Sequence, residues 1–228
     1  MIDGHRRSRR PRLSLAYRLR GAPPADLAAP PLLILLHGIG GNELAMAALA
    51  PAFDVRFLVI SARSPLEIAP FSFAWLSVEL TPDGPRVDAA EARRAWEALL
   101  AFIDEAVAAF GADPGRVFVA GFSQGGIVAL AALLTAPEKI AGVVCMSGRL
   151  LPEALPAAAP HDRLRGKPVL IVHGVLDATL PVEYGRRAAA TLRDLHLATD
   201  YRELDLGHAT SDESVAIASS WLTDRLGS

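Results

Sequence analysis

The stretch Gly121–Gly125, GFSQG, decides the fold, because it joins a short apolar run to a helical pattern. Residues 117–120 before it have the length of a buried strand, and Gln124–Thr135 after it are small and apolar, as in a helix packed closely on a sheet. A G-x-S-x-G pattern between strand and helix is typical of a sharp turn that lifts a serine hydroxyl above the sheet. Glycines on both sides remove side chains that would clash in such a turn. We therefore predict that Ser123 is a nucleophile.

Apolar runs of strand length alternate with longer helical patterns on both sides of this turn. Strands are expected at 13–19, 32–36, 57–60, 117–120, 143–146, 169–172 and 200–204, and helices at 87–110, 124–135, 182–195 and 211–226. This alternation predicts an α/β fold with a mostly parallel sheet and helices on both faces. Ligands bind beyond the carboxyl ends of the strands in such sheets, so we expect the site in the loops after residues 36, 120, 172 and 204.

Length and composition are typical of a single globular domain. Its 228 residues fit one α/β domain over 1–228, with 1–12 as a flexible basic N-terminus. The net charge of −2 gives no sign of a nucleic-acid partner. No apolar run is long enough to insert stably in a membrane, and no apolar segment of a secretory signal follows the N-terminal arginines. With a single cysteine, Cys145, the fold does not depend on disulfides, and we expect a cytoplasmic location.

A serine hydroxyl is a weak nucleophile, so it needs a base, and the base needs an acid to orient it. The expected chain order in this fold is serine, acid, histidine. Asp177 follows the predicted strand at 169–172, and His208 lies between the last strand and the last helix. Asp205 is the rival acid, but Asp177 is preferred because it follows a central strand. His37 and His173 precede the acid and are interpreted as structural.

Negative charge that develops on a substrate oxygen needs hydrogen-bond donors. One expected donor is the backbone N–H of Gln124, the residue after the nucleophile. The other is the backbone N–H of Ile39, in the glycine-rich run 37–41 after the strand at 32–36. The same glycine run is also compatible with a simple tight turn before a helix that starts near Asn42.

Cofactors and metals are not expected. The sequence has no H-E-x-x-H motif and no cysteine cluster, and its histidines are scattered. It has no phosphate-binding G-x-x-x-x-G-K-[ST] loop either. The expected partner is a small-molecule ester, and nothing in the sequence predicts whether the chain forms a homo-oligomer.

The long connection before the first long helix carries aromatic residues. Phe73, Trp75 and Leu76 are candidates for substrate binding, although residues 70–78 are equally compatible with a small satellite core. The segment 149–167 is too short for a large cap domain. We therefore expect an open site that accepts small or accessible esters.

Four motifs together resemble the phospholipase/carboxylesterase family of α/β-hydrolases, which includes bacterial carboxylesterases and acyl-protein thioesterases. They are LHGIGG at 36–41, GFSQGG at 121–126, VHGVLD at 172–177 and GH at 207–208. The segment DPGRV at 113–117 is also similar to the family, whereas Leu76 follows Trp75 where many members have Trp-Phe-Asp. The resemblance implies that Ser123, Asp177 and His208 form the catalytic triad. It also implies that the backbone N–H groups of Ile39 and Gln124 are the oxyanion donors.

The leading hypothesis is hydrolysis of a carboxylic ester through an acyl-enzyme on Ser123. A thioesterase or lysophospholipase would use the same mechanism, and acyl transfer to another acceptor would use the same residues. A hypothesis of a different class is a non-catalytic ligand-binding protein on a hydrolase scaffold, because fold alone does not determine function.

Overall fold

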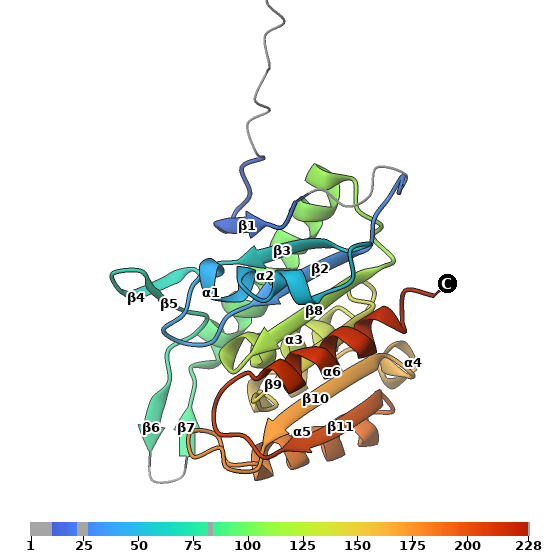
Figure 1. The fold of residues 1–228 in the computed structure, drawn as a ribbon. Helices are drawn as coiled ribbons and strands as arrows, with labels where there is room; N and C mark the ends of the chain where they lie inside the picture. The colour runs from blue at the N-terminus through green and yellow to red at the C-terminus, as the bar shows by residue number, and fades with distance from the viewer. Residues whose placement is uncertain (1–10, 22–26, 82–83, 228) are drawn as a thin grey trace, which may run out of the picture.

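The computed structural model describes residues 11–21, 27–81 and 84–227. Within them, seven strands form one sheet in the order β1-β3-β2-β8-β9-β10-β11. The strands are β1 Tyr17–Leu19, β2 Leu32–Leu36, β3 Leu58–Ala62, β8 Val117–Phe122, β9 Gly142–Met146, β10 Pro168–Gly174 and β11 Ala198–Leu204. Only β1 runs antiparallel to its neighbour, so the sheet is mostly parallel, as predicted (Figure 1).

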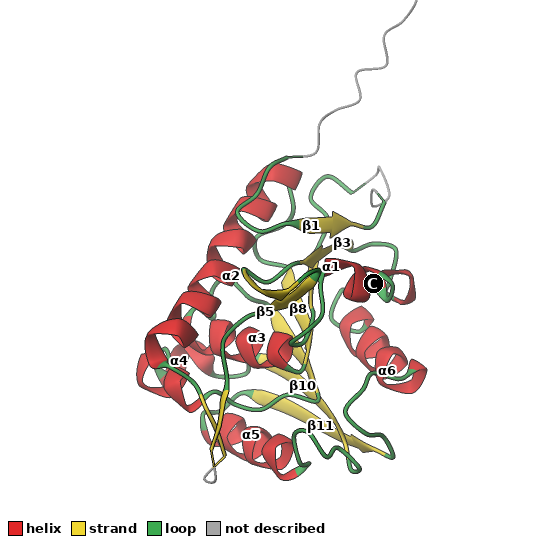
Figure 2. Ribbon diagram, turned by 90° about the vertical axis from the view of Figure 1, so that its left-hand side faces the viewer, coloured by secondary structure: helices red, strands yellow, loops and turns green. Residues whose placement is uncertain are grey.

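Helices cover both faces of the sheet (Figure 2). The α-helices are α1 Glu43–Ala47, α2 Ala89–Phe110, α3 Gln124–Thr135, α4 His161–Leu164, α5 Glu183–Asp194 and α6 Asp212–Thr223, and the 3-10 helices are η1 Ala50–Ala52 and η2 Pro152–Ala157. Alternate residues of β2 pack on opposite sides. Leu32, Ile34 and Leu36 join the core under α2, α3 and α5, whereas Leu33 and Leu35 join the core under α1 and α6. This two-sided burial explains why β2 reads as a continuous apolar run.

The long helix α2 shows how local sequence sets an element's bounds. It begins after Asp88, whose side chain accepts a hydrogen bond from the backbone N–H of Glu91. It ends at Gly111, which adopts the left-handed conformation with φ 63°. Its buried residues recur at three- and four-residue steps and pack in the core shared with α3 and the sheet: Ala92, Ala95, Trp96, Leu99, Phe102, Ile103 and Ala106.

Several bounds differ from the prediction. The first strand covers only Tyr17–Leu19 of the expected 13–19, and β8 runs two residues further, to Phe122. Two hairpins were not predicted: β4 Leu66–Ala69 with β5 Ser72–Ala74, and β6 Glu79–Thr81 with β7 Gly84–Arg86. The expectation for the basic segment 1–12 falls almost entirely outside the described residues.

The connection from β9 to β10 contains only the short helices η2 and α4, so no large cap covers the carboxyl ends of the strands, as predicted. Among the described residues, none of the helices has both the length and the apolar character needed to cross a bilayer.

Candidate active site

Ser123 lies in the sharp turn between β8 and α3, and its backbone is strained. Its φ of 51° and ψ of −120° are outside the regions that a serine normally occupies. The strand order brings this turn to the middle of the sheet, where the N–H of Ser123 donates to the carbonyl of Met146 at 2.8 Å. The side chain is thereby aimed out of the carboxyl end of the sheet.

The glycines around Ser123 are required by close packing. A Cβ on Gly121 would lie 2.2 Å from the carbonyl carbon of Gly125, and a Cβ on Gly125 would lie 2.3 Å from the carbonyl oxygen of Leu36. A Cβ on Gly126 would lie 2.7 Å from Cys145 Sγ. All three distances are far below van der Waals contact, so this turn can form only with glycine at these positions.

Three side chains predicted from the sequence form a chain of hydrogen bonds. His208 Nε2 is 3.0 Å from Ser123 Oγ, and His208 Nδ1 is 2.7 Å from Asp177 Oδ2. Ser123 follows β8, Asp177 follows β10, and His208 follows β11, so three separate loops at one edge of the sheet supply them. An Nδ1–H that donates to Asp177 leaves Nε2 free to accept the serine proton.

Asp177 is held from several directions. Its side chain is fully buried, and its Oδ1 accepts hydrogen bonds from the backbone N–H groups of Thr179 and Leu180, at 3.0 and 2.8 Å. These bonds orient Oδ2 toward His208. A buried carboxylate with its oxygens occupied in this way keeps a fixed geometry.

The competing residues lie elsewhere. Asp205 is exposed and has no hydrogen bond to His208. His37 is buried, with Nε2 accepting from the N–H of Ser64 and Nδ1 facing the carbonyl of Gly38 at 2.7 Å. His173 is also buried, and its Nε2 lies 2.8 Å from the carbonyl of Leu180 and 3.5 Å from Asp177 Oδ2. His173 therefore packs behind the acid.

The two predicted oxyanion donors have unoccupied N–H groups. Among the described residues, no hydrogen-bond acceptor faces the backbone N–H of Ile39 or of Gln124, whereas the N–H groups of Gly40 and Gly41 donate to Phe73 and Gly38. The loop lies against the nucleophile, because a Cβ on Gly38 would be 3.1 Å from the Cβ of Ser123. Two free donors beside the same hydroxyl suit a developing negative charge.

The candidate substrate-binding residues lie deeper than expected for a binding surface. Trp75 and Leu76 are each 1 % exposed and belong to the core, and Phe73 is 8 % exposed. The Gln124 side chain accepts from the N–H of Trp75 at 3.0 Å and donates to the carbonyl of Leu76 at 2.8 Å, and Trp75 Nε1 donates to the carbonyl of His37. These contacts connect the turn around Ser123, which we call the serine turn, to residues 37–41, which we call the oxyanion loop. Direct contact with substrate stays a prediction.

Sequence reasoning missed the support beneath the oxyanion loop. Glu43, which is buried, receives two hydrogen bonds from Arg63, both of 2.7 Å, and this pairing lowers the pKa of Glu43. Burial lowers the pKa of His37, which favours the neutral ring that accepts from Ser64. The partners are about 20 residues or more apart, so no local motif reports them.

No group of three His, Cys, Asp or Glu side chains in the described part of the chain could hold a metal ion.

The chain belongs to the phospholipase/carboxylesterase family, whose model matches residues 23–225. It is 32 % identical to a probable carboxylesterase and 28 % identical to a probable inactive carboxylesterase, both from Oryza sativa subsp. japonica; the alignments cover 85 and 87 % of this chain and 88 and 87 % of the relatives. It is 28 % identical to acyl-protein thioesterase 1 of Kluyveromyces lactis, over 81 % of this chain and 87 % of that protein. The crystal structure of esterase PE8 superposes with a TM-score of 0.77 at 26 % identity, covering 93 % of this chain and 98 % of that one. The family resemblance predicted from the motifs is confirmed.

Proposed function

We propose that this protein is a serine hydrolase that cleaves carboxylic esters through a covalent acyl-enzyme, with Ser123 as nucleophile, His208 as base and Asp177 as the orienting acid. The observation that carries the proposal is the unbroken chain of hydrogen bonds from Ser123 Oγ through His208 to Asp177. Membership of a family of carboxylesterases and phospholipases supports the same reaction class.

The reaction follows from these positions. Ser123 Oγ attacks the ester carbonyl carbon while His208 Nε2 takes its proton, and the protonated ring is stabilised by Asp177. His208 then gives the proton to the leaving alcohol, and the acyl group stays on Ser123. Water attacks this acyl-enzyme with His208 again as base, which releases the carboxylic acid and restores the serine.

The negative charge of each tetrahedral intermediate falls on the former carbonyl oxygen. The free N–H groups of Ile39 and Gln124 are the donors proposed for it. Gln124 is the first residue of α3, so the positive end of the helix dipole adds to the stabilisation. The hydrogen bonds of the Gln124 side chain to residues 75 and 76 keep this donor in place.

The substrate class is proposed to be small or accessible esters. Ile39, Val175 and Leu176 are exposed apolar residues on the loops that carry the oxyanion donor and the acid, so an acyl chain meets apolar surface there without passing through a lid. Thioesters and lysophospholipids are the alternative substrates of the same mechanism, and one relative is named an acyl-protein thioesterase. Rates on esters and thioesters with the same acyl chain separate these alternatives.

Replacement of the nucleophile tests the proposal. Ser123→Ala should lower kcat/KM for 4-nitrophenyl butyrate by at least about 10³-fold, since the covalent route is lost. It should also abolish labelling by a fluorophosphonate probe, with the labelled peptide located by mass spectrometry. Ser77→Ala, on an exposed loop, is the matched control and should keep both signals.

The same experiment addresses the non-catalytic hypothesis, which one relative named as inactive makes relevant. A ligand-binding protein with an unactivated serine would neither turn over the ester nor react with the probe. Unlabelled wild-type Ser123 would therefore overturn the proposal. Product analysis in the presence of added alcohols distinguishes hydrolysis from acyl transfer.

We also propose that residues 1–228 form one domain, for which a single cooperative unfolding transition is the test. The cytoplasmic location stays a prediction, supported by a single buried thiol that requires no oxidising compartment. Fractionation of the producing cells would test it.

A further inference from the structure

A cavity of about 400 Å³ lies between three segments of the chain. One wall is the segment that follows β9 and includes Arg149, Leu150 and Leu155; a second is α5, with Tyr184 and Arg187; the third is Pro85 in the β6–β7 hairpin. Figure 1 shows this hairpin reaching toward the end of the sheet where α5 begins. We call it the Arg149 cavity.

The walls of the Arg149 cavity belong to the same chain segments that pack on the serine turn and on the acid. Gly148 packs on the serine turn, since a Cβ added there would lie 3.3 Å from the carbonyl oxygen of Ser123. Arg149 is the next residue. On the opposite wall, α5 starts six residues after Asp177, and its Gly185 packs on His173 behind that acid. Both cationic walls are therefore continuous with the segments that hold the triad.

Arg149 is an unusual residue for this position. It is 7 % exposed, yet its guanidinium makes a single hydrogen bond, of 3.2 Å, to the carbonyl of Leu150, and none of the described carboxylates pairs with it. A guanidinium has five N–H donors, and a buried cation without a paired anion is unfavourable. Burial accordingly lowers the pKa of Arg149, with opposing contributions from Glu153 and Tyr184.

Two further unpaired donors line the same cavity. Arg187 lies over the Tyr184 ring, 4.7 Å from its centroid, and makes no ion pair or hydrogen bond in the described structure. The Tyr184 hydroxyl has no hydrogen-bond partner among the described residues either. Two guanidinium groups and a phenol therefore line one cavity, and the Leu150 carbonyl is the one hydrogen-bond acceptor found for them among the described residues. Such a donor set suits a carboxylate or phosphate group.

Glu153 adds a negative charge near Arg149. Glu153 raises the pKa of Arg149 but does not come within ion-pair distance of it, and its Oε2 is buried without a hydrogen-bond partner. A direct Arg149–Glu153 pair would satisfy both groups without any ligand. Even then the charge of Arg187 would be left over, so the cavity keeps a net positive charge.

We propose that the Arg149 cavity is an anion subsite that holds a carboxylate or phosphate group carried by the ester substrate, with Arg149 and Arg187 as its cations. This inference rests on the proposed function and narrows its substrate class to esters with a negative charge on the acyl or the alcohol part. The apolar lining from Pro85, Leu150 and Leu155 suits the carbon chain that connects the charge to the ester.

Matched ester pairs test the subsite. On the acyl side, mono-4-nitrophenyl esters of glutaric, adipic and suberic acid are compared with 4-nitrophenyl esters of the uncharged acids of equal chain length. On the alcohol side, 4-acetoxybutyrate is compared with 4-acetoxybutyramide in a pH-stat. The measured quantity is the ratio of kcat/KM for the charged ester to kcat/KM for its neutral partner. We expect this ratio to exceed one either for the acyl-side pairs or for the alcohol-side pair.

Variants assign that preference to the cavity. Arg187→Gln, at an exposed position, should lower the ratio about tenfold, as should Arg149→Lys, which keeps the charge but loses the planar fork. Glu153→Gln should raise the ratio, because it removes a competing anion. Arg193→Gln, on the same helix but outside the cavity, is the control for net charge and should leave the ratio unchanged.

The outcomes separate the two proposals. Turnover of neutral esters and probe labelling of Ser123, without any charge preference in either arm, would overturn the subsite and leave the hydrolase intact. A ratio insensitive to Arg187→Gln and Arg149→Lys would also overturn it. An internal ion pair would give a different result: Arg149→Gln and Glu153→Gln would lose equal stability, the double variant would lose no more than either, and the kcat/KM ratio would not change. This result would also overturn the subsite. No turnover and no labelling of Ser123 would overturn the hydrolase itself.

Discussion

At Ser123, the strained backbone and the absence of neighbouring side chains are two parts of one arrangement. The residue adopts φ 51°, which is costly for serine, and it is kept there by the bond of its N–H to Met146 and by packing of Gly125 on Leu36. The strain presents the hydroxyl to His208 at 3.0 Å. A relaxed turn would withdraw the hydroxyl from the base.

Asp177 and Asp205 provide a sharp comparison at the same scale. Asp177→Asn should lower kcat about 10³- to 10⁴-fold, because an amide can hold His208 in the wrong tautomer. Asp205→Asn, at an exposed position without contact to the ring, should change kcat less than about twofold. Steady-state kinetics on 4-nitrophenyl butyrate measures both. A crippled Asp205 variant beside an active Asp177 variant would reverse the assignment of the acid.

At the scale of elements, the strands and helices that could be predicted from the sequence are those with a local or periodic pattern. Strand β2 and helix α3 have the predicted bounds, because each is a continuous apolar segment buried on most sides. The positions of Ser123, Asp177 and His208 followed from motifs at strand ends, and the structure brings them within hydrogen-bond distance.

The rest depended on partners distant in sequence. The β4–β5 hairpin is positioned by the bridge between Gly41 and Phe73. Its strands have only three or four residues, which is too short for a periodic pattern to predict them. The same holds for the bond between Glu43 and Arg63 and for the Arg149 cavity, whose walls come from three separate segments. Sequence patterns report burial along one element, whereas these features arise where elements meet.

The Glu43–Arg63 pair joins α1 to the end of β3 and should make stability depend on pH. Pairing lowers the pKa of Glu43 from its ordinary value of 4.5, so its contribution is full above that value and is lost as the pH falls through the lowered pKa. Glu43→Gln should cost about 1–2 kcal/mol at pH 7, and this difference from the wild type should shrink below about pH 4. Urea unfolding at several pH values measures it. A constant difference down to pH 3 would contradict the assignment.

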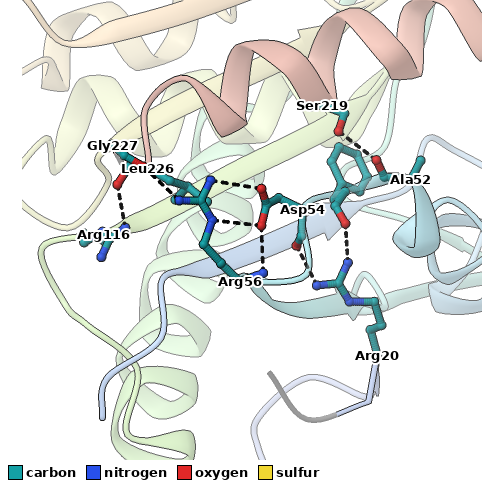
Figure 3. A network of polar contacts seen from close by, with 9 residues as sticks. Arg20, Ala52, Asp54, Arg56, Arg116, Ser219, Leu226 and Gly227 are labelled. Carbon is teal, nitrogen blue, oxygen red and sulfur yellow. Dashed lines mark hydrogen bonds and ion pairs between the residues drawn. The ribbon is translucent and has the colours of Figure 1, made fainter. Parts of the chain in front are cut away.

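At the scale of the whole molecule, a group of arginine contacts lies at the end of the sheet opposite the reactive groups. Figure 3 shows Arg20 among carbonyl oxygens of the segment before β3; its guanidinium donates to residues 50, 53, 54 and 57 at 2.7–2.9 Å. Nearby, Arg116 and Arg56 donate to the carbonyls of Leu226 and Gly227. These bonds connect both halves of the chain away from Ser123.

Arg20 should therefore contribute to stability and not to catalysis. Arg20→Met removes one donor from each of four carbonyls and leaves those of Phe53 and Phe57 without a hydrogen-bond partner among the described residues. It should lower the free energy of unfolding by about 2–3 kcal/mol. Below the unfolding transition, kcat should stay within about twofold of the wild type. Arg18→Met is the control, because the Arg18 side chain is exposed and makes no hydrogen bond in the described structure. Equal stability of the two variants in urea titrations would contradict the role given to Arg20.

The thiol behind the nucleophile has a practical consequence. Cys145 Sγ is enclosed between Gly126 and Gly148, and burial raises its pKa to about 12, so almost no thiolate is present at neutral pH. We therefore expect the native protein not to react with maleimides or disulfide reagents. A second cysteine placed at exposed Leu176 would be the sole reactive sulfur, and a fluorophore attached there would report events at the mouth of the site without removal of the native residue.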